Sequence, residues 1–331
     1  AALGAAGEDA RRGHDRMLAR GAGPRPEDRR GRVPDVIRAL APDELVWFLA
    51  RALAFQGHAD PMGFAQRLAP RLKEAKRDAL RSFIEQPDGV GPPRVGVHLR
   101  APGPDDDDRT ARMGPLWHEG DEHEARAFVA RLLERTPHDA AIVPLTGVPD
   151  DARERLLRWL APLGFELRER IRMRFSLSEV PPLGRPLTLE AWTLASDVAF
   201  RALYRRAERT ETGEARWSWL KRRGGRFRPD LWFLARPTPD QDPIGYAFCS
   251  GDDALDAHYR LEAAGVLPEH RTSTEMVRRL VLTTLLELAS RSPFGSVDVE
   301  ADARDPKLIE ILHSLGFEER TNDPRLERLP V

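Results

Sequence analysis

Hydrophobic positions along the chain follow two spacings, which predict strands alternating with helices. Short apolar runs such as 94–99 and 140–145 are typical of buried strands. Elsewhere apolar residues recur three and four positions apart, as at Leu45, Phe48 and Leu49, which is typical of a helix with one buried face. This order of elements predicts an α/β protein.

The same reasoning places most elements. Strands are expected over 36–40, 94–99, 110–117, 140–145, 166–177, 187–192, 231–235, 243–248, 258–267 and 297–300. Helices are expected after Pro42, in a second region that reaches about Ile84, over 121–135 and 151–161, in a long stretch ending near Lys221, and over 273–290 and 305–314.

Proline and glycine divide the chain. Pro181, Pro182, Gly184 and Pro186 form a linker-like stretch, where we place a domain boundary. Residues 1–34 carry few large apolar side chains and are predicted to be an extension. The expected parts are therefore the extension 1–34, a domain over 35–180 and a second domain over 186–331.

The order of elements repeats after the linker. The pattern L-x-x-L-G-F-E occurs at 160–166 and again at 312–318, an offset of 152 residues. Ile37 and Leu189 have the same offset, Gly96 and Gly245 have an offset of 149, and the stretches 114–116 and 265–267 have one of 151. Four matches in order indicate an internal duplication.

Composition narrows the possible functions. Lys and Arg number 52 against 53 Asp and Glu, so no overall charge attracts nucleic acid or an anionic membrane. The one cysteine, Cys249, excludes an intrachain disulfide, and no apolar run approaches the length of a membrane span. The first residues lack the pattern of a secretory signal. We therefore expect a cytoplasmic protein without a membrane or nucleic-acid partner, and its oligomeric state stays open.

Two segments of the second half carry a family resemblance. Gly265-Val266-Leu267-Pro268-Glu269-His270-Arg271 runs into a helix, and Asp305-Pro306 leads to Ser314-Leu315-Gly316-Phe317. Together they resemble the GNAT acetyltransferase superfamily, well over 186–331 and more weakly over 35–180. The resemblance implies two tandem GNAT-like acyl-CoA N-acyltransferase domains, each a mixed, mostly antiparallel sheet flanked by helices. It also implies acetyl-CoA as cosubstrate and a small-molecule or peptide amine as acceptor.

The resemblance also implies a coenzyme site in the second half. Its residues would be Ala264, Val266, Leu267, Arg271, Thr272, Ser273, Thr274, Glu275 and Met276. Helix amides and hydroxyls of the turn would bind the pyrophosphate. The same turn also fits a capping box in which Thr272 and Glu275 satisfy each other's amides, which would leave no such site. Glu262 either orders a water as catalytic base or has a structural role.

Several positions depart from the family pattern. Leu312 occupies the place of the usual tyrosine, and Asp305 that of the usual asparagine. The first half has no arginine at its corresponding turn and carries Glu119 and Asp121 there, so we interpret it as a degenerate copy. The expected function is an N-acetyltransferase with an active second half. The alternative is a non-catalytic pseudo-acetyltransferase that binds a ligand or a partner.

Two further patterns have competing interpretations. His118 and His123 lie in an acidic stretch, but five residues separate them, which does not fit a helical zinc pair, and no metal is expected. The segment 216–228 mixes arginines with Trp217, Trp219 and Phe227. It fits packing, an acidic acceptor or a coenzyme phosphate, or stacked nucleic acid.

Overall fold

The structure is a computed structural model, and it describes residues 36–330 except 75–79, 87–91, 103–108, 224–226, 252–253, 255 and 272–273. The predicted extension 1–34, the acidic run 105–108, and Thr272 and Ser273 of the predicted coenzyme turn lie outside the described residues.

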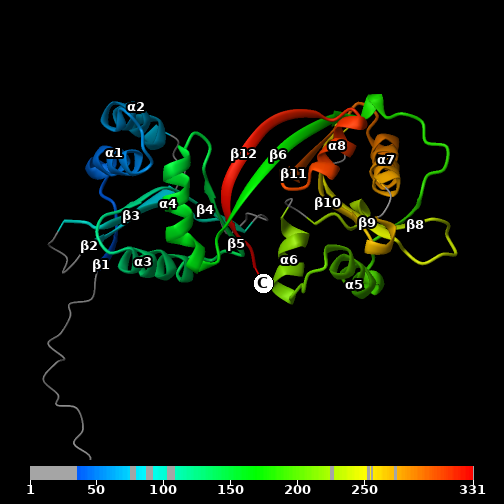
Figure 1. Cartoon of the computed structure of the whole chain (residues 1–331), viewed down its shortest axis with the longest axis horizontal. Coiled ribbons are helices and arrows are strands. Elements are labelled where there is room, and N and C mark those ends of the chain that lie inside the picture. The colour runs from blue at the N-terminus through cyan, green and yellow to red at the C-terminus, as the bar shows by residue number, and fades with distance from the viewer. Residues whose placement is uncertain are drawn as a thin grey trace, which may run out of the picture. The chain divides into compact units, whose positions relative to one another are not determined.

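Strands and helices alternate along both halves of the chain (Figure 1). The strands are β1 Val36–Ala39, β2 Leu80–Gln86, β3 Val95–Arg100, β4 Thr110–His118, β5 Ala140–Pro144, β6 Glu166–Ser176, β7 Thr188–Ala191, β8 Trp232–Arg236, β9 Gly245–Ser250, β10 His258–Val266, β11 Ser296–Asp302 and β12 Glu318–Arg328. The helices are α1 Leu45–Phe55, α2 Pro61–Glu74, α3 Glu122–Glu134, α4 Asp150–Leu160, α5 Asp197–Glu208, α6 Glu214–Arg222, α7 Thr274–Arg291 and α8 Pro306–Ser314. Within these described helices, none is both long and apolar enough to cross a bilayer.

All twelve described strands form one sheet in the order β1-β2-β3-β4-β5-β12-β6-β11-β10-β9-β8-β7. Neighbours are antiparallel except for β4 with β5 and β10 with β11, which are parallel. Each half thus contributes a mixed, mostly antiparallel sheet with one parallel pair, as the sequence predicted. The matched landmarks fall in corresponding strands, for Gly96 lies in β3 and Gly245 in β9, while Gly114 lies in β4 and Gly265 in β10.

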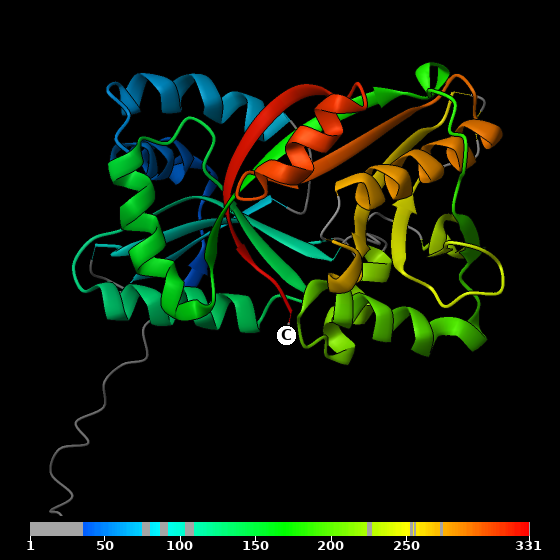
Figure 2. The ribbon, with the colours of Figure 1, turned by 45° about the vertical axis from the view of Figure 1, so that its right-hand side comes forward.

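The two halves exchange their last strands. β6, from the first half, pairs with β11 of the second half from Arg170 to Ser176. β12, from the second half, pairs with β5 of the first half from Ala141 to Pro144. β6 and β12 also pair with each other, and both views show them running side by side through the middle of the sheet (Figures 1 and 2). The linker at 181–186 therefore separates the halves in sequence, while the sheet is continuous across them.

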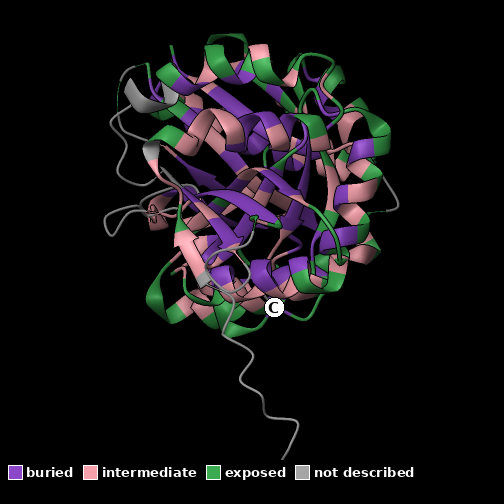
Figure 3. Ribbon diagram, turned by 90° about the vertical axis from the view of Figure 1, so that its left-hand side faces the viewer, coloured by how far each residue is buried: buried purple, intermediate pink, exposed green. Residues whose placement is uncertain are grey.

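In each half, one helix pair covers each face of the sheet. In the second half, α7 and α8 pack on the face that carries Phe233, Ala247 and Leu261. The α5 and α6 helices pack on the opposite face, which carries Trp232 and Phe248. The first half follows the same plan, with α1 and α2 in one core and α3 and α4 in another. In Figure 3 buried strand segments lie between helices whose outer surfaces are exposed. The strands buried along almost their whole length, β3, β8 and β9, are rich in apolar residues.

The repeated L-G-F motif ends a helix in both halves. Gly164 has a φ of +84° after α4, and Gly316 has a φ of +97° after α8. Both lie in the left-handed region that favours glycine, and both precede a long strand, β6 or β12. The two motifs therefore do the same structural task, which supports the duplication.

One sequence prediction is wrong. The region up to about Ile84 was expected to be helical, but Leu80–Gln86 forms strand β2, which pairs with both β1 and β3. Alternation places Ser82 and Ile84 in buried positions within this strand. The preceding residues favour helix, and pairing with two neighbours overrides that local preference.

Candidate active site

The parallel pair of the second half separates midway along its length. β10 pairs with β11 from His258 to Leu261, opposite Ser296 to Val299. Beyond Leu261, β10 remains paired with β9 as far as Val266 but has no ladder with β11. The edge of β10 that faces β11 therefore presents backbone groups to a V-shaped opening, here called the splay. Such an edge can accept an extended ligand as an added strand.

A β-bulge lies where the splay begins. The register of β10 against β9 shifts between Leu261 and Ala263, so Glu262 is the extra residue of the bulge. The Glu262 side chain is only 5% exposed, and its carboxylate accepts from Ser250 Oγ at 2.8 Å. Arg223 Nε lies 3.2 Å from the same carboxylate and Arg260 Nε 3.6 Å. The bulge therefore directs Glu262 inward and surrounds it with donors.

A cavity of about 320 Å³ occupies the splay. β10 lines it with Glu262, Ala263 and Ala264, and α8 lines it with Leu308 and Leu312. The next residue of β10, Gly265, has no room for a side chain, since a Cβ there would lie 2.9 Å from Glu208 Oε1 and 3.0 Å from Tyr246 Oη. The volume falls in the range of small-ligand sites.

Two phenols that sequence reasoning missed also line this cavity. Tyr204 comes from α5 and Tyr246 from β9, and their rings are 5.3 Å apart. The Tyr246 hydroxyl donates to Glu208 Oε1 at 2.8 Å. Burial raises the pKa of Tyr204, and the positive charge of Arg216 acts in the opposite direction. Tyr204 is therefore a protonated phenol at neutral pH, beside a cation, at a cavity wall.

Residues of the predicted coenzyme turn have varied surroundings. Val266 and Leu267 are buried, whereas Ala264 and Met276 are half-buried and Thr274 and Glu275 are exposed at the start of α7. The Arg271 guanidinium donates to the Val266 carbonyl at 3.0 Å and to the Ala207 carbonyl, and it lies 3.3 Å from Glu208. Arg271 thus ties the end of β10 to α5, and contact with a phosphate requires it to release these partners.

Aromatic rings pack together beside the corresponding region of the first half. There β4 pairs with β5 only from Thr110 to Arg112, so a splay begins in the same place. His118 of β4 lies 4.7 Å from the Trp159 ring of α4, and Phe55 of α1 lies 5.1 Å from His118. At the following turn, Asp121 accepts from the amides of His123 and Glu124 at the start of α3. A carboxylate therefore occupies the amides that an anion would need.

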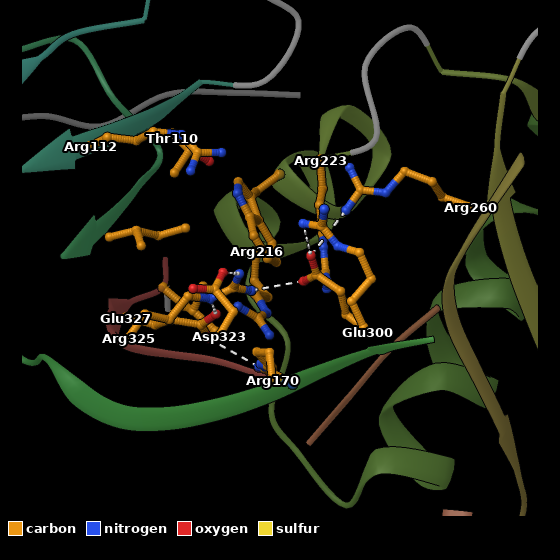
Figure 4. A pocket seen from close by; sticks show the side chains of 14 residues that line it. Thr110, Arg112, Arg170, Arg216, Arg223, Arg260, Glu300, Asp323, Arg325 and Glu327 are labelled. Atoms are coloured by element: carbon orange, nitrogen blue, oxygen red, sulfur yellow. Dashed lines mark hydrogen bonds and ion pairs between the residues drawn. The ribbon is translucent and has the colours of Figure 1, made fainter. Parts of the chain in front are cut away.

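A second cavity, of about 130 Å³, adjoins the splay and carries many charges (Figure 4). We call it the arginine cavity. Its charged lining consists of Arg112, Arg170, Arg172, Arg216, Arg223, Arg260 and Arg325, together with Glu300, Asp323 and Glu327. It shares Arg170, Arg216, Arg223, Glu300 and Leu329 with the splay cavity.

Glu300 of β11 is the centre of this charge network. Its carboxylate lies 2.9 Å from Arg325 Nη2, 3.2 Å from Arg172 Nη2 and 3.5 Å from Arg260 Nη2. Burial acts to raise the pKa of Glu300, but the positive charges around it, above all Arg325, outweigh burial and lower the pKa to about 2. Arginines at alternate positions of β6, such as Arg170 and Arg172, thus face carboxylates of β11 and β12.

Across the part of the chain that the structure describes, no group of three or more His, Cys, Asp and Glu side chains is arranged to hold an ion. His118, from the histidine-rich stretch, packs between Phe55 and Trp159, and burial lowers its pKa.

Comparisons with known proteins identify similar structures only. No protein-family profile and no curated protein matches the chain. A GCN5-related N-acetyltransferase from Sphaerobacter thermophilus is 13% identical, with 89% of this chain and 96% of that one covered and a TM-score of 0.46. A tandem GNAT protein from the clavulanic acid biosynthesis pathway is 18% identical, with 88% and 97% covered and a TM-score of 0.40. A GCN5-related N-acetyltransferase from Anabaena variabilis is 13% identical, with 89% and 73% covered and a TM-score of 0.41.

The order of the chain's elements and the pairing of its strands define the fold. The two halves of the chain are tandem α/β repeats that share one sheet.

Proposed function

We propose that the chain is an N-acetyltransferase that transfers an acetyl group from acetyl-CoA to an amine, and that only its second half is active. The observation that carries the proposal is the open splay between β10 and β11, with a cavity of about 320 Å³ beside it. In the first half, three aromatic rings and the Asp121 cap occupy the corresponding places.

The residues of the splay suit a pantetheine arm. From Glu262 to Val266 the inner edge of β10 has no strand partner, so its amides and carbonyls are directed at the opening. Ala263, Ala264 and Gly265 keep that edge free of bulky side chains. An arm with two amides can then bind as an added strand, which fixes its direction and depth.

The side chains around the cavity supply the proton transfers. An attacking amine must lose a proton, and a departing thiolate must gain one. Glu262 lies at the bulge and is placed to order the amine or a water that takes its proton. Tyr204, like any phenol, is protonated at neutral pH, and burial raises its pKa further. It lines the cavity and is the candidate acid in place of the tyrosine that Leu312 replaces. Tyr246 is less suited, since its proton is already donated to Glu208.

Calorimetry with acetyl-CoA tests the proposal. Ala264 is half-buried and lines the cavity, so Ala264→Phe fills the space where the arm would bind. We expect the natural protein to bind acetyl-CoA and Ala264→Phe to bind it at least about tenfold more weakly. The matched control is Ala191→Phe, which adds the same ring at an exposed position of β7 and leaves binding unchanged.

The outcomes separate the enzyme from its alternative. No binding by the natural protein would overturn the proposal and leave the non-catalytic, ligand- or partner-binding protein. Binding that Ala264→Phe leaves intact would place the coenzyme elsewhere. The proposal includes a cytoplasmic location.

A further inference from the structure

The arginine cavity is built by both halves of the chain. Thr110 and Arg112 of β4 come from the first half, Arg216 and Arg223 come from α6 or its end, and Arg325 comes from the exchanged strand β12. In Figure 4 these side chains converge on one space from different elements. The first half thus supplies a wall to a cavity that adjoins the splay of the second half.

Most arginines of the cavity are paired with carboxylates. Glu300 pairs with Arg325, Arg172 and Arg260, and Glu327 pairs with Arg170 and Arg325. Arg223 pairs with Glu262. In these ion pairs the carboxylates that line the cavity compensate the arginine charges, so the paired arginines attract a further anion only weakly.

Arg216 and Arg112 are different. Neither forms an ion pair with an acid among the described residues, and Nη1 of Arg216 is buried without a hydrogen-bond partner. The Arg216 guanidinium lies 4.5 Å from the centre of the Trp219 ring, which holds it in place. Burial lowers the pKa of Arg216, although Tyr204 and Glu327 act to raise it. A half-buried cation with a buried, unused donor is costly unless an anion binds there.

We propose that the acceptor amine carries an anionic group, a carboxylate or a phosphate, and that Arg216 and Arg112 hold this group in the arginine cavity. The inference rests on the proposed transferase function. A volume of about 130 Å³ accommodates a small anionic group. Because Arg216 and Arg223 line both cavities, an anion held there leaves an amine a few bonds away in the splay, next to Glu262 and Tyr204.

Direct anion binding is the first test. We measure binding of inorganic phosphate and of acetate by calorimetry at constant ionic strength, in the natural protein, Arg216→Met, Arg112→Met and Arg158→Met. Arg158 is exposed on α4, away from both cavities, and serves as the matched control. We expect one or both anions to bind the natural protein and the control equally, and to bind each cavity variant about ten- to a hundredfold more weakly. Arg112 is exposed, so its variant tests the cavity even where Arg216→Met destabilises the fold.

Paired amines then identify the anion. β-Alanine is compared with its amide, and phosphoethanolamine with ethanolamine, by release of free thiol from acetyl-CoA. We expect the charged member of at least one pair to react faster, and that advantage to disappear in Arg216→Met. Preference for β-alanine identifies a carboxylate, and preference for phosphoethanolamine a phosphate.

Failures of the two proposals are distinguishable. Anion binding unchanged in both cavity variants, or absent from a natural protein that binds acetyl-CoA, would overturn the inference and leave the transferase intact. The variants could instead bind acetyl-CoA more weakly and keep the same amine preference. That result would assign the arginines to coenzyme phosphates and would also overturn the inference. A natural protein that fails to bind acetyl-CoA refutes the proposed function itself, and with it the inference as stated.

Discussion

Replacing Glu300 by glutamine removes the negative charge at the centre of the arginine network while keeping the shape of the side chain. The side chain is only 9% exposed, so solvent screens its interactions weakly. Its pKa falls from the model-compound value of 4.5 to about 2 on folding. At 1.36 kcal/mol per pKa unit, the ionised carboxylate therefore contributes about 3 kcal/mol to the free energy of unfolding at pH 7.

The pH dependence follows from the direction of this shift. Because the folded pKa is lower than the unfolded one, the contribution is fully present above about pH 4.5 and is lost as the pH falls towards 2. Glu300→Gln should thus be less stable than the natural protein by about 3 kcal/mol at pH 7 and by only about 1 kcal/mol at pH 3. Urea unfolding at pH 7, 5, 4 and 3 measures this difference.

The difference in unfolding free energy between the natural protein and Glu300→Gln is taken at each pH, so the contributions of all other carboxylates cancel to first order. Glu154→Gln is the control, because Glu154 is exposed on α4 and forms no ion pair with another described residue, so it should be close to neutral throughout. A difference for Glu300→Gln that stays constant between pH 7 and pH 3 would refute the assignment of this stability to the ionised carboxylate.

Two further predictions concern the halves and the proton donor. Residues 35–180 and 186–331, expressed separately, should each lack a neighbouring strand that the other half supplies and should remain poorly folded. When mixed, they should form a folded one-to-one complex, which circular dichroism and size-exclusion chromatography would detect. A half that folds alone as a monomer contradicts this prediction. Tyr204→Phe removes only the hydroxyl, so kcat should fall by about 10²-fold or more. The affinity for acetyl-CoA, measured by calorimetry, should be retained. Unchanged turnover would exclude Tyr204 as the acid.

The sequence predicts much of the fold because its signals are local. Apolar spacing located nearly every strand and helix, and the L-G-F motifs at Gly164 and Gly316 mark two helix ends where a left-handed residue is required. Local signals fail for β2, whose residues follow a helix-favouring stretch and become a strand only by pairing with β1 and β3. They also fail for the strand exchange. β6 and β12 both follow an L-G-F motif, so this local signal does not indicate which half's sheet each strand joins.

The candidate site is less predictable than the fold. Glu262 and Ala264 were found because they lie on the strand that carries the family resemblance. Tyr204 was missed because it recurs with Phe200 at helical spacing, which is typical of a buried helix face. Arg112 was missed because it lies in the other half of the chain and reaches the arginine cavity only through tertiary structure.

The exchanged strands also bear on how the protein is made. The residues of β12 that pair with β5 come about 180 positions after it in the chain. At 5–20 residues per second, β5 waits roughly 10 to 40 s on the ribosome for its partner. Throughout that interval its edge offers unpaired amides and carbonyls, a template for wrong pairing with β6 or with another nascent chain. The sheet of the first half is therefore completed only late in synthesis, when β12 pairs with β5. Chaperones that bind open sheet edges should raise the yield of native protein.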